Sequence, residues 1–207
     1  MDEVIIEEHS AQTPPPSKSR GARLTALLAT HALVFIAALS LFAAADSWST
    51  ITGLNIAVAL CVVAGALAGI TMTTLVHEWF HYLGARYADA SYDIPDKRGL
   101  FLYNWDYAHN SVRQFMIMSI AGTVGGVLAL MLLWLSVPTD GWGRAALHGG
   151  AIASVVFAAV IEWPVIRRVR SSRDPLAELS KIDQHVLTRS FVVSSVAGVL
   201  MTLFLVS

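Results

Sequence analysis

His77, Glu78 and His81 have the types and spacing of a metal-dependent hydrolytic site, because together they form an HExxH string. In an α-helix, residues four apart lie about 40° from each other around the axis, so both imidazoles can reach one Zn²⁺. Glu78 lies about 100° away and can act as general base toward a water that the metal activates. The alternative is that neighbouring helices satisfy the two histidines while Glu78 pairs with Arg86.

The composition around this string is that of a multi-pass membrane protein. Of 207 residues, 55% are hydrophobic and 14% are charged, and the mean hydropathy is +0.59. These values exclude the ordinary soluble globular class. The single cysteine, Cys61, excludes an intrachain disulfide and a cysteine-based zinc site. The net charge of −1 and the scattered basic residues indicate no nucleic-acid partner.

We expect an all-α membrane protein with about five transmembrane helices. Residues 1–20 are polar and proline-rich and predict a disordered tail, whereas residues 21–207 form one polytopic membrane domain. The first apolar run is too long for a cleaved signal peptide and is interpreted as an anchor. The expected spans cover residues 22–45, 51–87, 114–137, 145–166 and 190–207.

The basic residues predict how the chain is oriented in the bilayer. With the N-terminus in the cytoplasm, 13 of the 14 Lys and Arg residues fall in cytoplasmic segments, and only Arg144 lies outside. We therefore expect a cytoplasmic N-terminus and an external C-terminus, in the cell membrane. The HExxH end of the second span then faces the cytoplasm.

A catalytic zinc ion usually has a third protein ligand, and Glu162 in the fourth span is the best candidate. Glu162 precedes Arg167 by five residues, as His81 precedes Arg86, so both lie about 7.5 Å from a basic anchor. Asp174 is the alternative ligand. Glu162 can instead be a snorkelling carboxylate that pairs with one of the arginines following it.

Two glycine motifs indicate close helix packing. Gly65 and Gly69 form a GxxxG motif in the second span, and Gly122 and Gly126 form another in the third. Glycine lets helix backbones approach each other in lipid. The motifs predict that the second and third spans pack on each other.

With these features the chain resembles the site-2 protease family of intramembrane zinc metalloproteases. The resemblance covers residues 54–174 and rests on HExxH in one span, a glycine-rich returning span and an acid on the next. It implies a three-helix metalloprotease core with His77 and His81 as zinc ligands, Glu78 as catalytic base and an acidic third ligand. The family's Asn-Pro and Leu-Asp-Gly signature is absent, and Glu162 followed by Pro164 stands in its place.

The segment between the second and third spans predicts a small β-hairpin. Residues 90–94 and 100–105 flank a turn-like stretch at 95–99, and a free strand edge beside the metal can bind an unwound substrate as an added strand. The alternative is an interfacial loop with Tyr103, Trp105 and Tyr107 among the lipid headgroups. Asp106 and His109 can bind metal but are interpreted as polar interfacial residues.

The remaining histidines and the segment after the fourth span are interpreted as structural. His31, His148 and His185 lack paired spacing and are expected to be structural. Residues 171–188 predict a helix on the membrane surface that starts at Asp174 and Pro175.

These observations lead to the hypothesis of a zinc-dependent endopeptidase that acts in the lipid bilayer and cuts membrane-anchored protein substrates near the cytoplasmic face. Two alternatives stay open: a non-catalytic protein that keeps a protease-like fold and binds membrane partners, and a zinc hydrolase that acts on lipid. A strand beside the metal favours peptide, whereas a wide lateral opening lined only by apolar side chains favours lipid.

Overall fold

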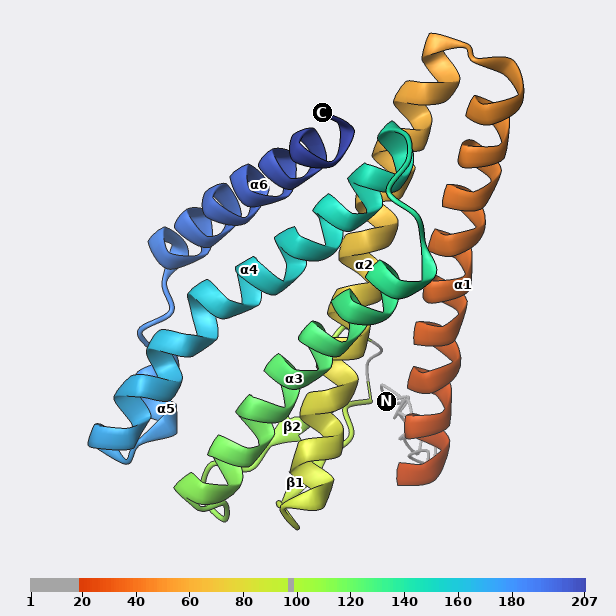
Figure 1. Ribbon diagram of the computed structural model, residues 1–207. Helices are drawn as coiled ribbons and strands as arrows, with labels where there is room; N and C mark the ends of the chain where they lie inside the picture. The colour runs from red at the N-terminus through yellow and green to blue at the C-terminus, as the bar shows by residue number, and fades with distance from the viewer. Residues whose placement is uncertain (1–18, 97–98) are drawn as a thin grey trace, which may run out of the picture.

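The chain folds into a bundle of long helices with a small two-stranded sheet at one end (Figure 1). The computed structural model describes residues 19–96 and 99–207, so most of the predicted tail lies outside the described residues. The elements are α1 (Arg20–Thr52), α2 (Asn55–Tyr87), β1 (Tyr92–Asp93), β2 (Asn104–Trp105), α3 (Val112–Ser136), α4 (Trp142–Ser172), α5 (Pro175–Leu179) and α6 (Gln184–Val206).

The prediction of five membrane-spanning helices is confirmed. Across residues 19–96 and 99–207, α1, α2, α3, α4 and α6 are each long and apolar enough to cross a bilayer. Several helices extend beyond the predicted spans: α1 continues to Thr52 rather than 45, and α4 to Ser172 rather than 166. Hydropathy marks the part of a helix that lipid can cover, whereas backbone hydrogen bonding continues into polar sequence.

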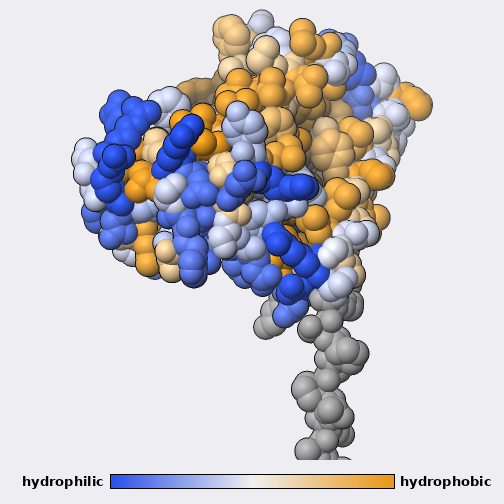
Figure 2. Space-filling view, turned by 90° about the horizontal axis from the view of Figure 1, so that it is seen from below, coloured by the Kyte–Doolittle hydropathy of each residue, from blue (hydrophilic) through white to orange (hydrophobic). Residues whose placement is uncertain are grey.

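The two ends of the bundle differ in the elements they carry. The hairpin, α5 and the start of α1 lie at one end, and the α1–α2 and α3–α4 connections lie at the other (Figure 1). Seen from the hairpin end, hydrophilic residues cover much of the surface, and hydrophobic residues continue along the upper and right-hand part (Figure 2). This distribution suits a helix bundle whose sides face lipid.

Helix α2 is the centre of the bundle, since it packs against α1, α3 and α4, while α6 packs on the outer side of α4 (Figure 1). Helices α2 and α4 run in the same direction, and α3 returns between them. This topology brings His81 of α2 and Glu162 of α4 together, with His81 Nε2 3.2 Å from Glu162 Oε1.

The glycine motif of α2 contacts a different helix from the one predicted. A side chain at Gly65 would collide with the backbone of Gly143, and one at Gly69 with the carbonyl oxygen of Leu147, so both glycines face α4. Helix α3 does pack on α2, as predicted, but with its own Gly122 against α2. A GxxxG motif indicates that another helix packs closely on this face, but it does not indicate which helix.

The predicted hairpin is present, although each strand has only two residues. Tyr92 pairs with Trp105 and Asp93 with Asn104 in an antiparallel register. The hairpin is fixed to α1, because Arg23 lies 3.3 Å from a carboxylate oxygen of Asp93 and also forms an ion pair with the loop that follows β1.

The helix predicted over residues 171–188 is wrong in extent. Asp174 does cap a helix, accepting a hydrogen bond from the N–H of Ala177, but this helix, α5, ends at Leu179. Asp183 then caps the N-terminus of α6. A second capping aspartate starts a new helix nine residues after the first, which the apolar spacing alone did not indicate.

The close approach of α2 to α4 predicts that a single methyl group at Gly69 destabilises the protein. Because a Cβ there meets backbone atoms that cannot rotate away, Gly69→Ala should lower the free energy of unfolding by about 1–3 kcal/mol. Gly21→Ala is the control, since nothing lies within 4 Å of a Cβ at that position. Thermal unfolding in detergent would compare the two; equal stability would contradict backbone contact between α2 and α4.

Candidate metal centre

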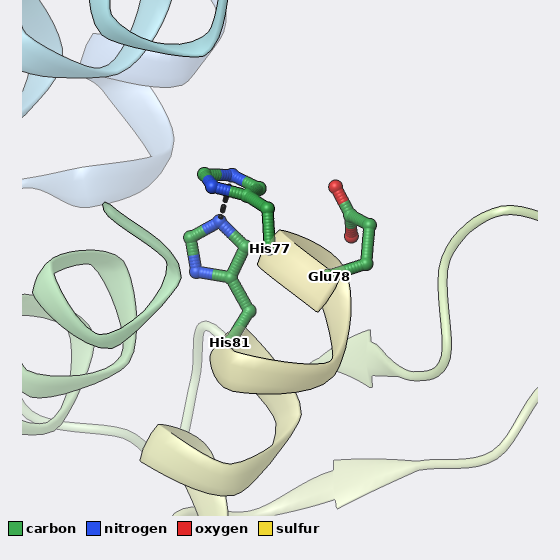
Figure 3. A group of neighbouring side chains, drawn as sticks. All are labelled: His77, Glu78 and His81. Carbon is green, nitrogen blue, oxygen red and sulfur yellow. Dashed lines mark hydrogen bonds between the residues drawn. The ribbon is translucent and has the colours of Figure 1, made fainter. Parts of the chain in front are cut away.

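His77 and His81 lie one turn apart on α2, and their imidazole rings face each other (Figure 3). The Nε2 atoms are 2.9 Å apart, and the ring planes are nearly perpendicular, at 85°. His77 is buried, with 8% of its side chain exposed, and 13% of the His81 side chain is exposed. The helical spacing therefore brings the two imidazole nitrogens to one point, as expected for residues four apart in a helix.

Glu162 reaches this point from α4. Its Oε1 lies 2.8 Å from Nε2 of His77 and 3.2 Å from Nε2 of His81. Ligand atoms about 2.0–2.1 Å from a tetrahedral zinc ion stand about 3.3 Å apart, so the three atoms need only a small outward shift to surround one ion. Asp174, the alternative ligand, caps α5 with its carboxylate instead.

The hydrogen bonding of the group suits a cation. His81 donates from Nδ1 to the carbonyl oxygen of Met118 at 2.9 Å, which leaves the Nε2 of a neutral ring with its lone pair toward His77 and Glu162. The second carboxylate oxygen of Glu162, Oε2, is buried without a hydrogen-bond partner among the described residues. Acceptor atoms that converge in a buried place fit a positive ion, and a buried carboxylate without one is costly.

Glu78 lies beside the two histidines without pairing to either. One atom from each of His77, Glu78 and His81 can be chosen so that all three lie within 4.8 Å of one another. The Glu78 side chain extends on a different side of α2 from the imidazoles (Figure 3). Within residues 19–96 and 99–207, its carboxylate forms no hydrogen bond or ion pair, so the alternative pairing with Arg86 is absent there. A free carboxylate at this place is available to accept a proton.

Close packing between helices fixes the positions of the candidate ligands. A Cβ at Gly122 would overlap the imidazole ring of His81, so only glycine at this position of α3 leaves room for the ring. Between α2 and α4, the hydroxyls of Thr74 and Ser154 hydrogen-bond to each other at 2.8 Å, one turn from His77. These contacts hold α3 and α4 against the HExxH turn of α2.

A cavity of about 510 Å³ opens beside this candidate metal site. Glu78, His81 and Glu162 form part of its wall, and both residues of β2 form another part. The remaining walls are mostly apolar and come from the hairpin, α3, α4 and the α5 segment. They include Phe101, Leu102, Phe115, Met118, Ile161, Val165, Ile166, Leu179 and Ile182.

Other residues considered from the sequence lie apart from this group. His31 and His148 hydrogen-bond to the carbonyl oxygens of Gly99 and Val137 at 3.0 Å each, and His185 is exposed. Asp106 and His109 form an exposed pair at 2.7 Å. The hydrogen bond from His109 lowers the pKa of Asp106.

Sequence reasoning missed two parts of the site. The Met118 carbonyl that orients His81 carries no sequence signal, since every residue has a carbonyl group. Tyr103 and Trp105 were placed in the predicted hairpin or, alternatively, among the lipid headgroups, and no role was given to their side chains, which line the cavity. The available signal was the aromatic residues within the predicted hairpin.

Comparison of the chain with models of protein families, with curated proteins and with solved structures finds no match. The interpretation of the site therefore depends on its own residues and their geometry.

The space at Gly122 predicts that a methyl group there weakens metal binding. Gly122→Ala forces the ring of His81 away from its position and from the Met118 carbonyl, so affinity for a divalent metal should fall about 10- to 100-fold. Gly126→Ala is the control on the same helix, because a Cβ there comes no closer than 3.4 Å to His77. Metal titration of both purified variants checks this, and equal affinities would show that His81 is not held by the fit to Gly122.

Proposed function

We propose that the protein is a zinc-dependent intramembrane endopeptidase that cleaves membrane-anchored protein substrates near the cytoplasmic face of the membrane. The observation that carries the proposal is that Glu162 on α4 reaches both HExxH histidines on α2. Two imidazoles and one carboxylate, with a position left for water, are the ligand set of many zinc hydrolases. His77, His81 and Glu162 would hold the ion, and the bound ion would polarise the scissile carbonyl and make water more acidic.

Glu78 is the proposed general base. Its carboxylate is unpaired in the described structure and borders the cavity, so it can take a proton from the attacking water. Glu78 then passes this proton to the nitrogen of the leaving amine as the C–N bond breaks. The carboxylate that transfers this proton must not itself bind the metal. Glu78 is free for this role because Glu162 is the proposed carboxylate ligand.

The position of β2 favours a peptide as substrate. The sheet has two strands, so within the described residues β2 pairs on one side with β1 only. Both residues of β2 line the cavity that contains Glu78 and His81. An unwound substrate segment can pair with this edge and present an extended amide to the site. A helical segment would keep its amides within its own hydrogen bonds, so local unwinding must precede cleavage.

The first test separates catalysis from a retained fold. Glu78→Gln removes the proton acceptor but keeps the size of the side chain, so zinc content should persist at about one ion per chain while proteolysis falls by about 10²- to 10⁴-fold. Glu162→Gln removes an anionic ligand, so both zinc content and activity should fall. Elemental analysis and cleavage of single-span proteins in liposomes measure these outcomes.

Identical fragment patterns from wild type and Glu78→Gln would remove support for a protease. The same result with retained zinc would favour a non-catalytic protein that binds membrane partners. Release of fatty acid by wild type, abolished in Glu78→Gln, would indicate a lipid hydrolase.

We further propose that the hairpin end of the bundle faces the cytoplasm, which the distribution of Lys and Arg supports. In a Cys61→Ser background, Ala108→Cys at the hairpin end should react with a membrane-impermeant thiol reagent only from the cytoplasmic side. Pro138→Cys, exposed at the opposite end, should react only from outside. The reverse pattern would invert the orientation and place cleavage at the other face.

A further inference from the structure

Tyr103 occupies a place in the cavity that the proposed reaction has not yet used. It directly precedes β2 and lines the same cavity as Glu78, His81 and Glu162. A substrate strand paired with β2 would therefore pass beside the phenol ring. Tyr103 therefore lies in the cavity between β2, the proposed substrate-binding strand, and the proposed metal ligands.

The ring of Tyr103 is fixed by other aromatic rings. Its centroid lies 5.5 Å from that of Tyr92, 6.2 Å from that of Tyr82 and 6.4 Å from that of Trp105. Tyr82 directly follows His81 in α2, so the aromatic cluster connects the ring of Tyr103 to the turn that carries a metal ligand. A group held in this way needs little reorganisation during a reaction.

The hydroxyl of Tyr103 is free to donate a hydrogen bond. Among residues 19–96 and 99–207, it has no hydrogen-bond partner, and it is not one of the fully buried unpaired atoms. Burial of the ring, together with the nearby carboxylates of Glu78 and Glu162, raises the pKa of Tyr103, so the phenol keeps its proton at neutral pH.

Two other hydroxyl groups in the cavity are less suited to this role. The Ser119 hydroxyl donates to the sulfur of Met118 at 4.0 Å, and Tyr107 is 39% exposed and has no ring contact within the aromatic cluster. Attack of water on an amide carbon moves negative charge onto the carbonyl oxygen, and an oriented donor stabilises this charge most when its position is fixed in advance.

We propose that Tyr103 is a catalytic residue whose hydroxyl donates a hydrogen bond to the scissile carbonyl oxygen as that oxygen gains negative charge. The proposal rests on the proposed peptidase function. Tyr103 gives up no proton in this role: water supplies the hydroxyl group of the new carboxylic acid, and Glu78 carries the proton of that water to the leaving amine. Tyr103 contributes only to the stability of the transition state.

The test compares Tyr103→Phe with wild type, using a fluorogenic single-span substrate in proteoliposomes. Phenylalanine keeps the ring and its packing, so zinc content, thermal stability and KM should stay near wild type while kcat falls about 10²- to 10³-fold. Tyr82→Phe is the control, because it removes a hydroxyl from the same aromatic cluster at a residue that does not line the cavity. Its kcat should stay near wild type.

A phosphinic peptide of the same sequence gives a second readout. The oxygens on its tetrahedral phosphorus carry negative charge, as the carbonyl oxygen does in the transition state. Tyr103→Phe should therefore weaken binding of this inhibitor by about the same factor by which it lowers kcat. A structural role would change stability or KM and leave the ratio of inhibitor affinity to substrate affinity unchanged.

The outcomes distinguish this proposal from the proposed function. Cleavage by wild type but not Glu78→Gln, with full kcat in Tyr103→Phe, would overturn the role of Tyr103 alone. Equal losses of kcat in Tyr103→Phe and Tyr82→Phe would also overturn it, because a general disturbance of the cluster would then explain the effect. Identical behaviour of wild type and Glu78→Gln would overturn the peptidase function and the role of Tyr103 together.

Discussion

The backbone contact between α2 and α4 is the constraint on which the rest of the structure depends. Lipid gives helices no hydrophobic reason to associate, so they are held by close packing and by polar contacts. Gly65 and Gly69 let α4 approach until its backbone touches α2, and this approach brings Glu162 within 3.2 Å of both histidines. A leucine layer between the helices would separate their axes further, and Glu162 would then not reach the imidazoles.

The hairpin adds to this helical core the elements that a bundle lacks. A helix satisfies its own backbone hydrogen bonds and offers no free edge to an extended peptide. The short β2 strand provides such an edge in the cavity that also contains Glu78, His81 and Glu162. Arg23 of α1 pairs with Asp93 in the hairpin. Glu178 of α5 is buried and pairs at 2.8 Å with Arg168 and Lys181. Hydrogen bonds from Lys181 and Arg168 lower the pKa of Glu178 and keep it charged. Its ion pair with Arg168 fixes α5 against α4.

The sequence predicted those features that have a local or one-dimensional signal. The HExxH string predicted the histidine pair, and five apolar runs predicted five helices. Equal distances from basic residues led to Glu162, which lies 81 residues beyond His81 in the chain. Features that depend on which helix faces which were predicted poorly. Gly65 and Gly69 could not identify α4 as their partner, because a motif marks one face of a helix and carries no information about its neighbour. The break between α5 and α6 escaped notice because apolar spacing continued across two capping aspartates.

The hydrogen bond from His81 to Met118 has a consequence for how readily this site can change. Met118 and Gly122 are four residues, or about one helical turn, apart on α3. The Met118 carbonyl, which accepts a hydrogen bond from His81, therefore points along the helix toward Gly122. The absence of a side chain at Gly122 leaves room for the imidazole of His81 beside the carbonyl that orients it. A side chain at position 122 would therefore push the ring from its place and from the carbonyl that holds its orientation, so one small residue serves two requirements of the candidate site.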